Sequence, residues 1–196
     1  MMQTILSHAL VLFASAAHAG HGPAPAELFC SVEPPVEESA ARTRRIVRGS
    51  EVVVRAVAVG SSTPGRTLKP WDSDRLAFAV KEVLKGSDVP DTLLIHGIVT
   101  DQNDFQDGPV PYVTHRSRVS GGGACMTRFY KLGAEYLFLL SRRRGEPAAQ
   151  LTPYWQLLAP TNEQLRGPDD PWLKWVRLQL RLTAPAAAPA QRRTTP

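Results

Sequence analysis

The first 19 residues of this chain contain no Asp, Glu, Lys or Arg, although these four residue types make up 21% of the whole sequence. Their apolar run, residues 10–17, is too short to span a bilayer. Ala17-His18-Ala19 then places small residues at the positions that signal peptidase reads. These features predict a secretory signal peptide over residues 1–19, cleaved near Ala19, and a secreted or periplasmic location. The alternative is an ordinary buried or anchoring helix at the N-terminus.

Cysteine is nearly absent, since Cys30 and Cys125 are the only two in the chain. Disulfides persist in the oxidising compartments that exported proteins reach. Two cysteines allow one pairing, so the sequence predicts a Cys30–Cys125 disulfide that closes a loop of about 95 residues. In the chain-entropy model such a bond stabilises the fold by roughly 4–5 kcal/mol. The alternative is a nucleophilic Cys125 with His115 as its base.

Catalytic motifs are also missing. The patterns G-x-S-x-G and H-E-x-x-H and the Cys/His spacings of metal sites do not occur. The sequence therefore predicts a protein that is not an enzyme and needs no cofactor. After residue 19 no run is long and apolar enough to cross a membrane. His21 would stand second in the cleaved chain, where a free amine and an imidazole together can bind Cu(II), so His21 is a candidate metal ligand.

Positive charge exceeds negative charge. The formal net charge is +5, and 18 of the 23 basic residues are arginine. Because arginine binds phosphate and carboxylate groups in a bidentate manner, one interpretation is an anionic partner, such as nucleic acid, a lipid headgroup or an acidic glycan. The other is a solvated basic surface. Aromatic residues make up only 7% of the chain, and export separates it from cytoplasmic nucleic acid, so a nucleic-acid partner is not favoured.

Runs rich in β-branched, aromatic and aliphatic residues predict the strands of an all-β domain. These runs cover residues 51–59, 75–86, 92–98, 135–140 and 151–159. Val83-Leu84 breaks the alternation of the second run, which predicts a bulge or a bend before Lys85-Gly86. Gly133 is expected to turn the chain into the fourth run, because glycine tolerates a positive φ. Pro153 places the fifth run near a sheet edge or a bulge.

Helices are expected at both ends of this β-rich region. Residues 40–48 are interpreted as a short helix or a loop that leads into the first strand. Thr161-Asn162-Glu163-Gln164 has the spacing of a capping box, which predicts a short helical turn. Asp170-Pro171-Trp172 has the pattern of an N-cap, a first helical residue and a buried aromatic residue, so a C-terminal α-helix is expected to follow.

Composition divides the chain into four regions. These are the signal peptide (1–19), an extended Pro-containing arm (20–38), the folded domain (39–183) and an Ala/Pro-rich tail expected to be disordered (184–196).

Residues 99–123 lack a regular pattern, and an irregular segment this long inside a domain is usually functional or disordered. Its candidate side chains are Asp101, Asp104 and Asp107 for a metal ion and His115, Arg116 and Arg118 for a ligand. The aspartates are spaced somewhat like a calcium loop. Phe105 stands where the EF-hand pattern needs an oxygen ligand, so the alternative is a solvated acidic loop.

The order of motifs resembles a known family. An N-terminal cysteine and a Val-rich strand are followed by F-x-V-x-x-V-L-K-G, another strand, a variable loop and C-(x)7-G-x-x-Y-L-F-L-L. These motifs are Cys30, Val52–Val59, Phe78–Gly86, Leu93–Ile95, Cys125, Gly133 and Tyr136–Leu140. The pattern resembles the OB-fold barrel of netrin-like domains and tissue inhibitors of metalloproteinases, in the version found in exported bacterial proteins.

The resemblance implies a five-stranded OB-fold-like barrel with a flanking C-terminal helix and a first strand pinned by the disulfide. In the family's protease inhibitors the first cysteine begins the mature chain, belongs to a Cys-x-Cys pair and chelates the protease zinc. Here Cys30 lies about ten residues after the expected cleavage point, and Val32 occupies the place of the second cysteine. The zinc-chelating wedge is therefore not carried over to this chain.

The resulting hypothesis is a non-enzymatic exported binding module for a protein or glycan partner. Its alternatives are a basic module that binds an anionic polymer, a metalloproteinase-inhibitor-like protein, and an enzyme of uncharacterised type.

Overall fold

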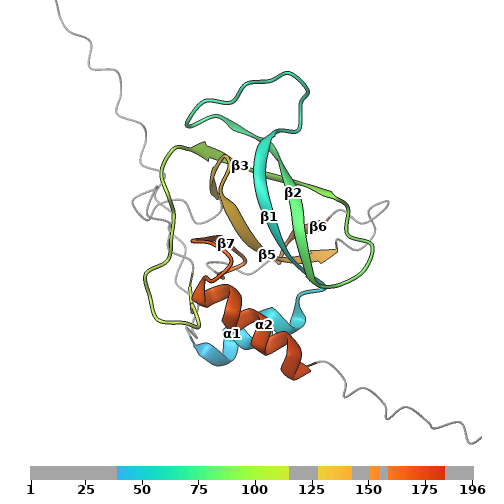
Figure 1. Ribbon diagram of the computed structural model, residues 1–196, viewed down its shortest axis with the longest axis vertical. Helices are drawn as coiled ribbons and strands as arrows, with labels where there is room; N and C mark the ends of the chain where they lie inside the picture. The colour runs from blue at the N-terminus through green and yellow to red at the C-terminus, as the bar shows by residue number, and fades with distance from the viewer. Residues whose placement is uncertain (1–38, 115–127, 143–150, 155–158, 184–196) are drawn as a thin grey trace, which may run out of the picture.

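The computed structural model describes residues 39–114, 128–142, 151–154 and 159–183, which contain two helices and seven strands. The helices are α1 (Ala40–Gly49) and α2 (Pro171–Thr183). The strands are β1 (Val52–Ser61), β2 (Ser73–Lys85), β3 (Thr92–Thr100), β4 (Phe129–Lys131), β5 (Glu135–Arg142), β6 (Leu151–Pro153) and β7 (Asn162–Leu165). The predicted all-β class with a flanking C-terminal helix is confirmed (Figure 1).

One sheet contains all seven of these strands, in the order β4-β3-β2-β1-β5-β6, with β7 also paired to β5. The first three strands form an antiparallel meander, and β5 runs antiparallel to β1. β4 is the exception, because it pairs with β3 in a parallel direction. The expected number of five strands is wrong, because two further short strands, β4 and β7, join the sheet. The fifth predicted run forms only the three-residue strand β6.

Side chains connect the two margins of the sheet. No backbone ladder joins β4 to β7 within the described residues. The side-chain amide of Asn162 instead donates to the hydroxyl of Tyr130, and the Arg128 guanidinium donates to the carbonyl of Ala159 over 2.9 Å. The margins therefore lie within side-chain reach of each other, and polar side chains hold them together.

The long meander strands are bent at bulges. Val53 pairs with Lys85 and Val54 with Val83, so Leu84 is an extra residue on β2. This is the bulge that the broken alternation at Val83-Leu84 predicts. Because a bulge increases the local twist, it helps the strand to curve around the core.

The sheet buries both of its faces at β1 and β5. Val52 and Val54 point into one core with Phe78, Tyr130 and Phe138. The intervening Val53, with Leu137 and Leu139 of β5, points into a second core against the helices, which also holds Ile46 and Trp172. Alternate residues of a strand point to opposite faces, and this explains why the run Tyr136–Leu140 is apolar without interruption.

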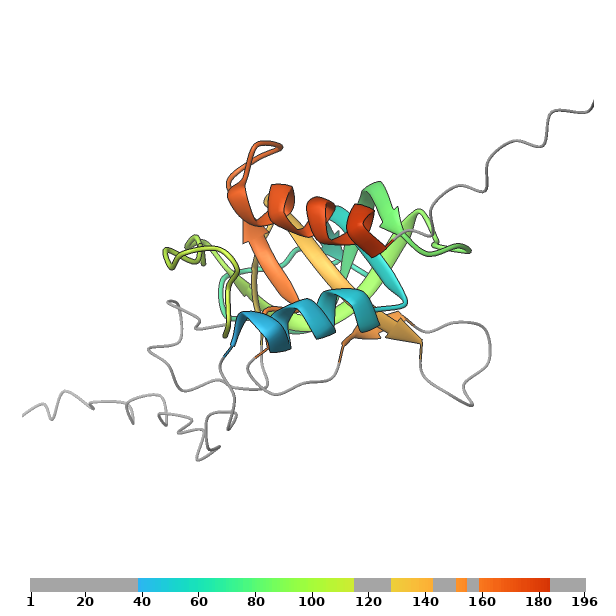
Figure 2. The same cartoon turned by 90° about the horizontal axis from the view of Figure 1, so that it is seen from below.

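The two helices lie side by side over the second core (Figure 2). The Ser39 hydroxyl accepts the backbone N–H of Arg42 and caps the start of α1. At the other end of α1 the Lys85 ammonium donates to the carbonyls of Arg48 and Ser50, over 2.7 and 2.5 Å. Burial lowers the pKa of Lys85, and the nearby Glu51 partly offsets this.

The start of α2 follows the sequence prediction. One carboxylate oxygen of Asp170 accepts the N–H of Trp172 over 2.8 Å, and the other accepts the N–H of Arg166 over 2.9 Å. Asp170 is thus the N-cap, and Trp172 is fully buried.

The predicted helical turn at Thr161–Gln164 is wrong, because Asn162–Leu165 form strand β7. These residues pair with Phe138–Glu135 of β5, and all four are buried. The backbone groups along this side of β5 need hydrogen-bond partners, and that requirement outweighs the local capping-box preference. The predicted fifth strand is shorter than expected, since β6 ends at Pro153 and residues 155–158 lie outside the described part.

Two core tyrosines are expected to make the fold sensitive to alkali. Burial raises the pKa of both Tyr130 and Tyr136 well above the ordinary value of 10.0. Unfolded tyrosines ionise near that value while the folded ones keep their protons, so stability is retained below pH 10 and falls as the pH rises further. The expected loss is about 1.4 kcal/mol per pH unit for each tyrosine.

Urea unfolding at pH 8 and pH 11, with tyrosinate absorbance followed in parallel, tests this expectation. Tyr136→Phe should remove part of the pH dependence. Reversible ionisation of all four tyrosines near pH 10 in a protein that stays folded would contradict it.

Candidate binding face

The loop between β1 and β2 carries an exposed tryptophan on a strained backbone. Trp71 has a φ of +74°, a region that costs a residue with a Cβ atom about 1 kcal/mol or more. The residue nevertheless stays 59% exposed. Its ring meets Phe129 of β4 edge-on, with 5.9 Å between the ring centroids. Strain of this kind is concentrated at functional sites, where surrounding contacts maintain it.

Backbone hydrogen bonds hold Trp71 in place. Its N–H donates to the carbonyl of Val99 over 2.7 Å, and the N–H of Val99 donates to the carbonyl of Asp72 over 2.9 Å. The Asp72 carboxylate accepts the N–H of Lys69 over 2.9 Å and closes the preceding turn. The indole ring therefore stands on a fixed backbone, which reduces the entropy lost when a ligand stacks on it.

Strand β4 links Trp71 to a polar cleft. Phe129 and Lys131 are two residues apart, so their side chains leave β4 on the same side, about 7 Å apart along the strand. Trp71 lies against Phe129, while Lys131 lines an open cleft of about 400 Å³. The remaining lining residues are Asn103, Leu132, Gly133, Ala134, Glu135, Gln164, Leu165, Arg166 and Gly167.

Amide and charged groups give the cleft its chemistry. The Asn103 side-chain oxygen accepts from the Lys131 ammonium over 3.2 Å and from the Gln164 amide over 3.0 Å. The backbone N–H of Lys131 also donates to the hydroxyl of Tyr136 in β5, over 2.7 Å. Glu135 lies within 3.8 Å of the Arg55 guanidinium. The cleft thus presents amides, one ammonium, one guanidinium and one carboxylate, all held by neighbours.

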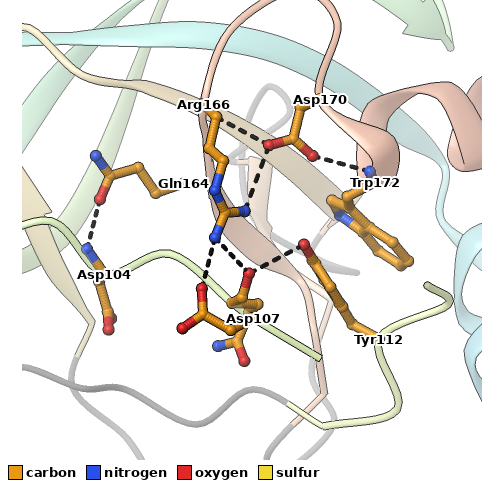
Figure 3. Close-up of polar contacts among 8 residues, drawn as sticks. Asp104, Asp107, Tyr112, Gln164, Arg166, Asp170 and Trp172 are labelled. Atoms are coloured by element: carbon orange, nitrogen blue, oxygen red, sulfur yellow. Dashed lines mark hydrogen bonds and ion pairs between the residues drawn. The ribbon is translucent and has the colours of Figure 1, made fainter. Parts of the chain in front are cut away.

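Arg166 fastens the loop after β3 to the start of α2 (Figure 3). Its guanidinium donates to Asp107 over 2.7 Å and to the carbonyl of Gln106 over 2.8 Å. It also lies 4.8 Å above the Phe105 ring. Its second acidic neighbour, the Asp170 carboxylate, is 3.9 Å away. Arg166 therefore orders one wall of the cleft.

The three aspartates proposed as metal ligands occupy different positions. Asp107 pairs with Arg166, the buried Asp104 donates its N–H to the Gln164 side chain over 2.7 Å, and Asp101 is exposed. Within the described ranges, no group of three His, Cys, Asp or Glu side chains is arranged to hold a metal ion. Here Asp104 and Asp107 attach the loop to β7 and Arg166.

Two charged residues, Glu163 of β7 and Arg128 just before β4, lie close enough for their charges to influence each other. Glu163 is fully buried, and the guanidinium of the half-buried Arg128 donates to the carbonyl of Ala159. Burial lowers the pKa of Arg128, and the charges of Glu163 and Asp104 partly offset that effect. The hydrogen bond from Arg128 to Ala159 connects the start of β4 to the segment before β7.

Several residues singled out in the sequence lie outside the described part of the chain. They are His21, Cys30, His115, Arg116, Arg118 and Cys125. The disulfide, the copper ligand and the basic ligand-binding residues therefore stay predictions. His96 lies within the described part, at an exposed position of β3.

Sequence reasoning did not identify Trp71, Lys131, Gln164 or Arg166 as site residues. One signal was present, because Trp71 is a large aromatic residue in a loop that Pro and Gly residues mark. No comparable signal marks Lys131 or Gln164, which meet through pairings between distant segments.

Comparison with protein-family models, with curated proteins and with solved structures finds no match to this chain. The similarity to netrin-like domains thus rests on the sequence motifs alone. No helix in the described part is long and apolar enough to cross a bilayer.

Proposed function

We propose that this chain is an exported, non-enzymatic module that binds a glycan across Trp71 and the adjoining cleft. The exposed Trp71 ring on its strained and hydrogen-bonded backbone carries the proposal. An aromatic ring offers an apolar face on which a sugar ring can stack. Amide, guanidinium and carboxylate groups next to it supply the hydrogen bonds that a sugar's hydroxyl groups require.

The position of the face supports the same interpretation. In OB-folds the second and third strands and the loop between the first two strands bind oligosaccharides and oligonucleotides. Trp71 lies in the β1–β2 loop and is bonded to β3. We infer an OB-fold-like barrel as the scaffold, with the short strand β4 completing the wall beside the cleft.

The binding role is favoured over catalysis by how the charged groups are held. Arg166 is paired with Asp107, Lys131 with Asn103, and Glu135 lies beside Arg55. Groups fixed in this way can orient a ligand.

Substituting Trp71 should separate binding from folding. Trp71→Gly removes the ring and relieves the positive φ, so the free energy of unfolding is expected to change by no more than about 1 kcal/mol. Binding to glycans should weaken roughly 30-fold, as expected for loss of a binding hot spot worth about 2 kcal/mol. Val59→Ala, at a residue with 57% exposure, is the matched control and should bind as the wild type does.

An array of neutral and acidic bacterial glycans identifies the ligand, and calorimetry at low and high salt measures its affinity. Binding of a neutral glycan that depends on Trp71 supports the proposal. If the protein binds only acidic polymers, if salt weakens that binding, and if the Trp71 substitution does not change it, the anionic-polymer alternative would replace the proposal. Absence of any glycan binding would leave a protein partner and overturn the glycan assignment.

A further inference from the structure

The helix pair has an unusual charge content. α1 contains four arginines, α2 contains one lysine and two arginines, and neither helix contains an acidic residue. The helices lie side by side and run in the same direction, so their last turns, with Arg48 and Arg181, are at the same end of the pair (Figure 2). This concentrates positive potential on one face of the molecule.

Only part of this charge is used within the fold. Arg42 is buried and reaches the carbonyl of Val113, Arg177 pairs with Glu82 over 2.6 Å, and Lys174 pairs with Asp169 over 2.9 Å. In the described part of the chain, Arg48 and Arg181 form no ion pair, and both are exposed. Their guanidinium groups are therefore available to an anionic partner.

Two exposed leucines lie beside these cations. Leu178 and Leu182 of α2 are 45% and 66% exposed, and both lie outside the two cores. They are four residues apart and so share one side of the helix, next to Arg181. Leucines on the outside of a cationic helix match a surface that has anionic groups above an apolar layer. A soluble polyanion would leave them in water.

We propose that the α1–α2 face docks on a bilayer rich in anionic phospholipid. Arg48 and Arg181 contact the phosphate groups, and Leu178 and Leu182 enter the boundary between headgroups and acyl chains. The β1–β2 loop lies at the opposite end of the sheet from the helices (Figure 1). A docked molecule would therefore present Trp71 away from the bilayer.

Sedimentation of the full chain with lipid vesicles tests this docking. Vesicles of equal parts phosphatidylglycerol and phosphatidylcholine should bind the wild type at least tenfold more tightly than pure phosphatidylcholine vesicles. The neutral vesicles also measure the background binding of the apolar residues 1–19. Arg48→Gln with Arg181→Gln should weaken binding to the anionic vesicles roughly 30-fold, because each basic residue near such a surface adds about a factor of five.

A second pair of variants distinguishes a bilayer from a soluble polyanion. Leu178→Ser with Leu182→Ser should weaken vesicle binding roughly tenfold or more through lost apolar contact, while heparin binding stays the same. Arg66→Gln with Lys69→Gln, in the β1–β2 loop, is the charge-matched control and should bind vesicles as the wild type does. Wild-type affinity in the leucine variant, or equal losses in the charge control, would overturn the proposal. Circular dichroism verifies that every variant is folded.

Discussion

Replacing Trp172 by alanine is expected to lower the free energy of unfolding by about 3–5 kcal/mol. Trp172 is fully buried and packs parallel to Tyr112 on one side and to Trp175 on the other. The ring centroids are 5.0 and 5.2 Å apart, with interplanar angles of 23° and 10°. Alanine would leave a cavity between α2 and the loop after β3, and the flanking rings are held too firmly to fill it.

Hydrogen bonds hold Tyr112 in its position beside Trp172. Tyr112 accepts the Thr43 hydroxyl at its backbone carbonyl over 2.7 Å, and its own hydroxyl donates to the carbonyl of Gln106 over 3.3 Å. The stack therefore ties α1, α2 and the loop together. Loss of Trp172 should also loosen the loop that Arg166 holds against the cleft, so glycan binding is expected to weaken with stability.

Urea unfolding followed by circular dichroism gives the energies. Trp172→Phe is the graded control, because it keeps an aromatic ring and removes an indole N–H that has no hydrogen-bond partner in the described ranges. Its expected cost is below about 2 kcal/mol. Trp71→Gly controls for the loss of any tryptophan. An alanine variant no less stable than the phenylalanine variant would show that the stack is not central to the fold.

The long strands and α2 could be predicted because their signals are local, whereas the sequence left α1 open between a short helix and a loop. Val52–Val59 is rich in valine and Tyr136–Leu140 is apolar throughout, so both runs are evident in the sequence. Asp170 caps α2 through residues next to it in the chain. The bulge at Leu84 also leaves a local trace in the broken alternation of β2.

The short strands could not be predicted, because distant partners decide them. β4 has three residues and exists through its parallel pairing with β3, while β7 forms on the open side of β5. At Thr161–Gln164 the local capping pattern favours a helical turn, but pairing with β5 makes this segment a strand. Two parallel strands are joined by a long connection, so their pairing leaves no pattern in a short stretch of sequence.

The candidate binding face was hidden for the same reason. Lys131, Asn103 and Gln164 come from three separate segments and meet only after β4 and β7 join the sheet. The sequence predicts a metal site at the aspartates of the loop, because carboxylates are common metal ligands. In the structure Asp107 is held by its ion pair with Arg166 and Asp104 by its backbone bond to Gln164, while Asp101 is exposed.

Replacing Gly97 by alanine is expected to destabilise the fold by about 3 kcal/mol, the upper part of the range for overpacked cores. A Cβ atom at Gly97 would lie 2.4 Å from two ring carbons of Tyr130 and 2.9 Å from the carbonyl oxygen of Arg128. Tyr130 has no room to retreat. Its ring is fully buried against Phe78 and Tyr136, with centroid distances of 4.9 and 5.1 Å, and its hydroxyl is bonded to Asn162.

Two further variants test whether the destabilisation comes from the contact between Gly97 and Tyr130. Gly108→Ala is the matched control, since nothing lies within 4 Å of the added atom, and it should leave the urea midpoint nearly unchanged. Tyr130→Leu in the Gly97→Ala background removes the clashing ring carbons, so the double variant should lose clearly less stability than the two single losses added together. If the two losses simply add, or if Gly97→Ala unfolds at the wild-type midpoint, then β4 does not pack against β3 through Gly97 and Tyr130. The cleft beside Lys131 would then lose its structural basis, because β4 positions both Phe129 under Trp71 and Lys131 at the cleft.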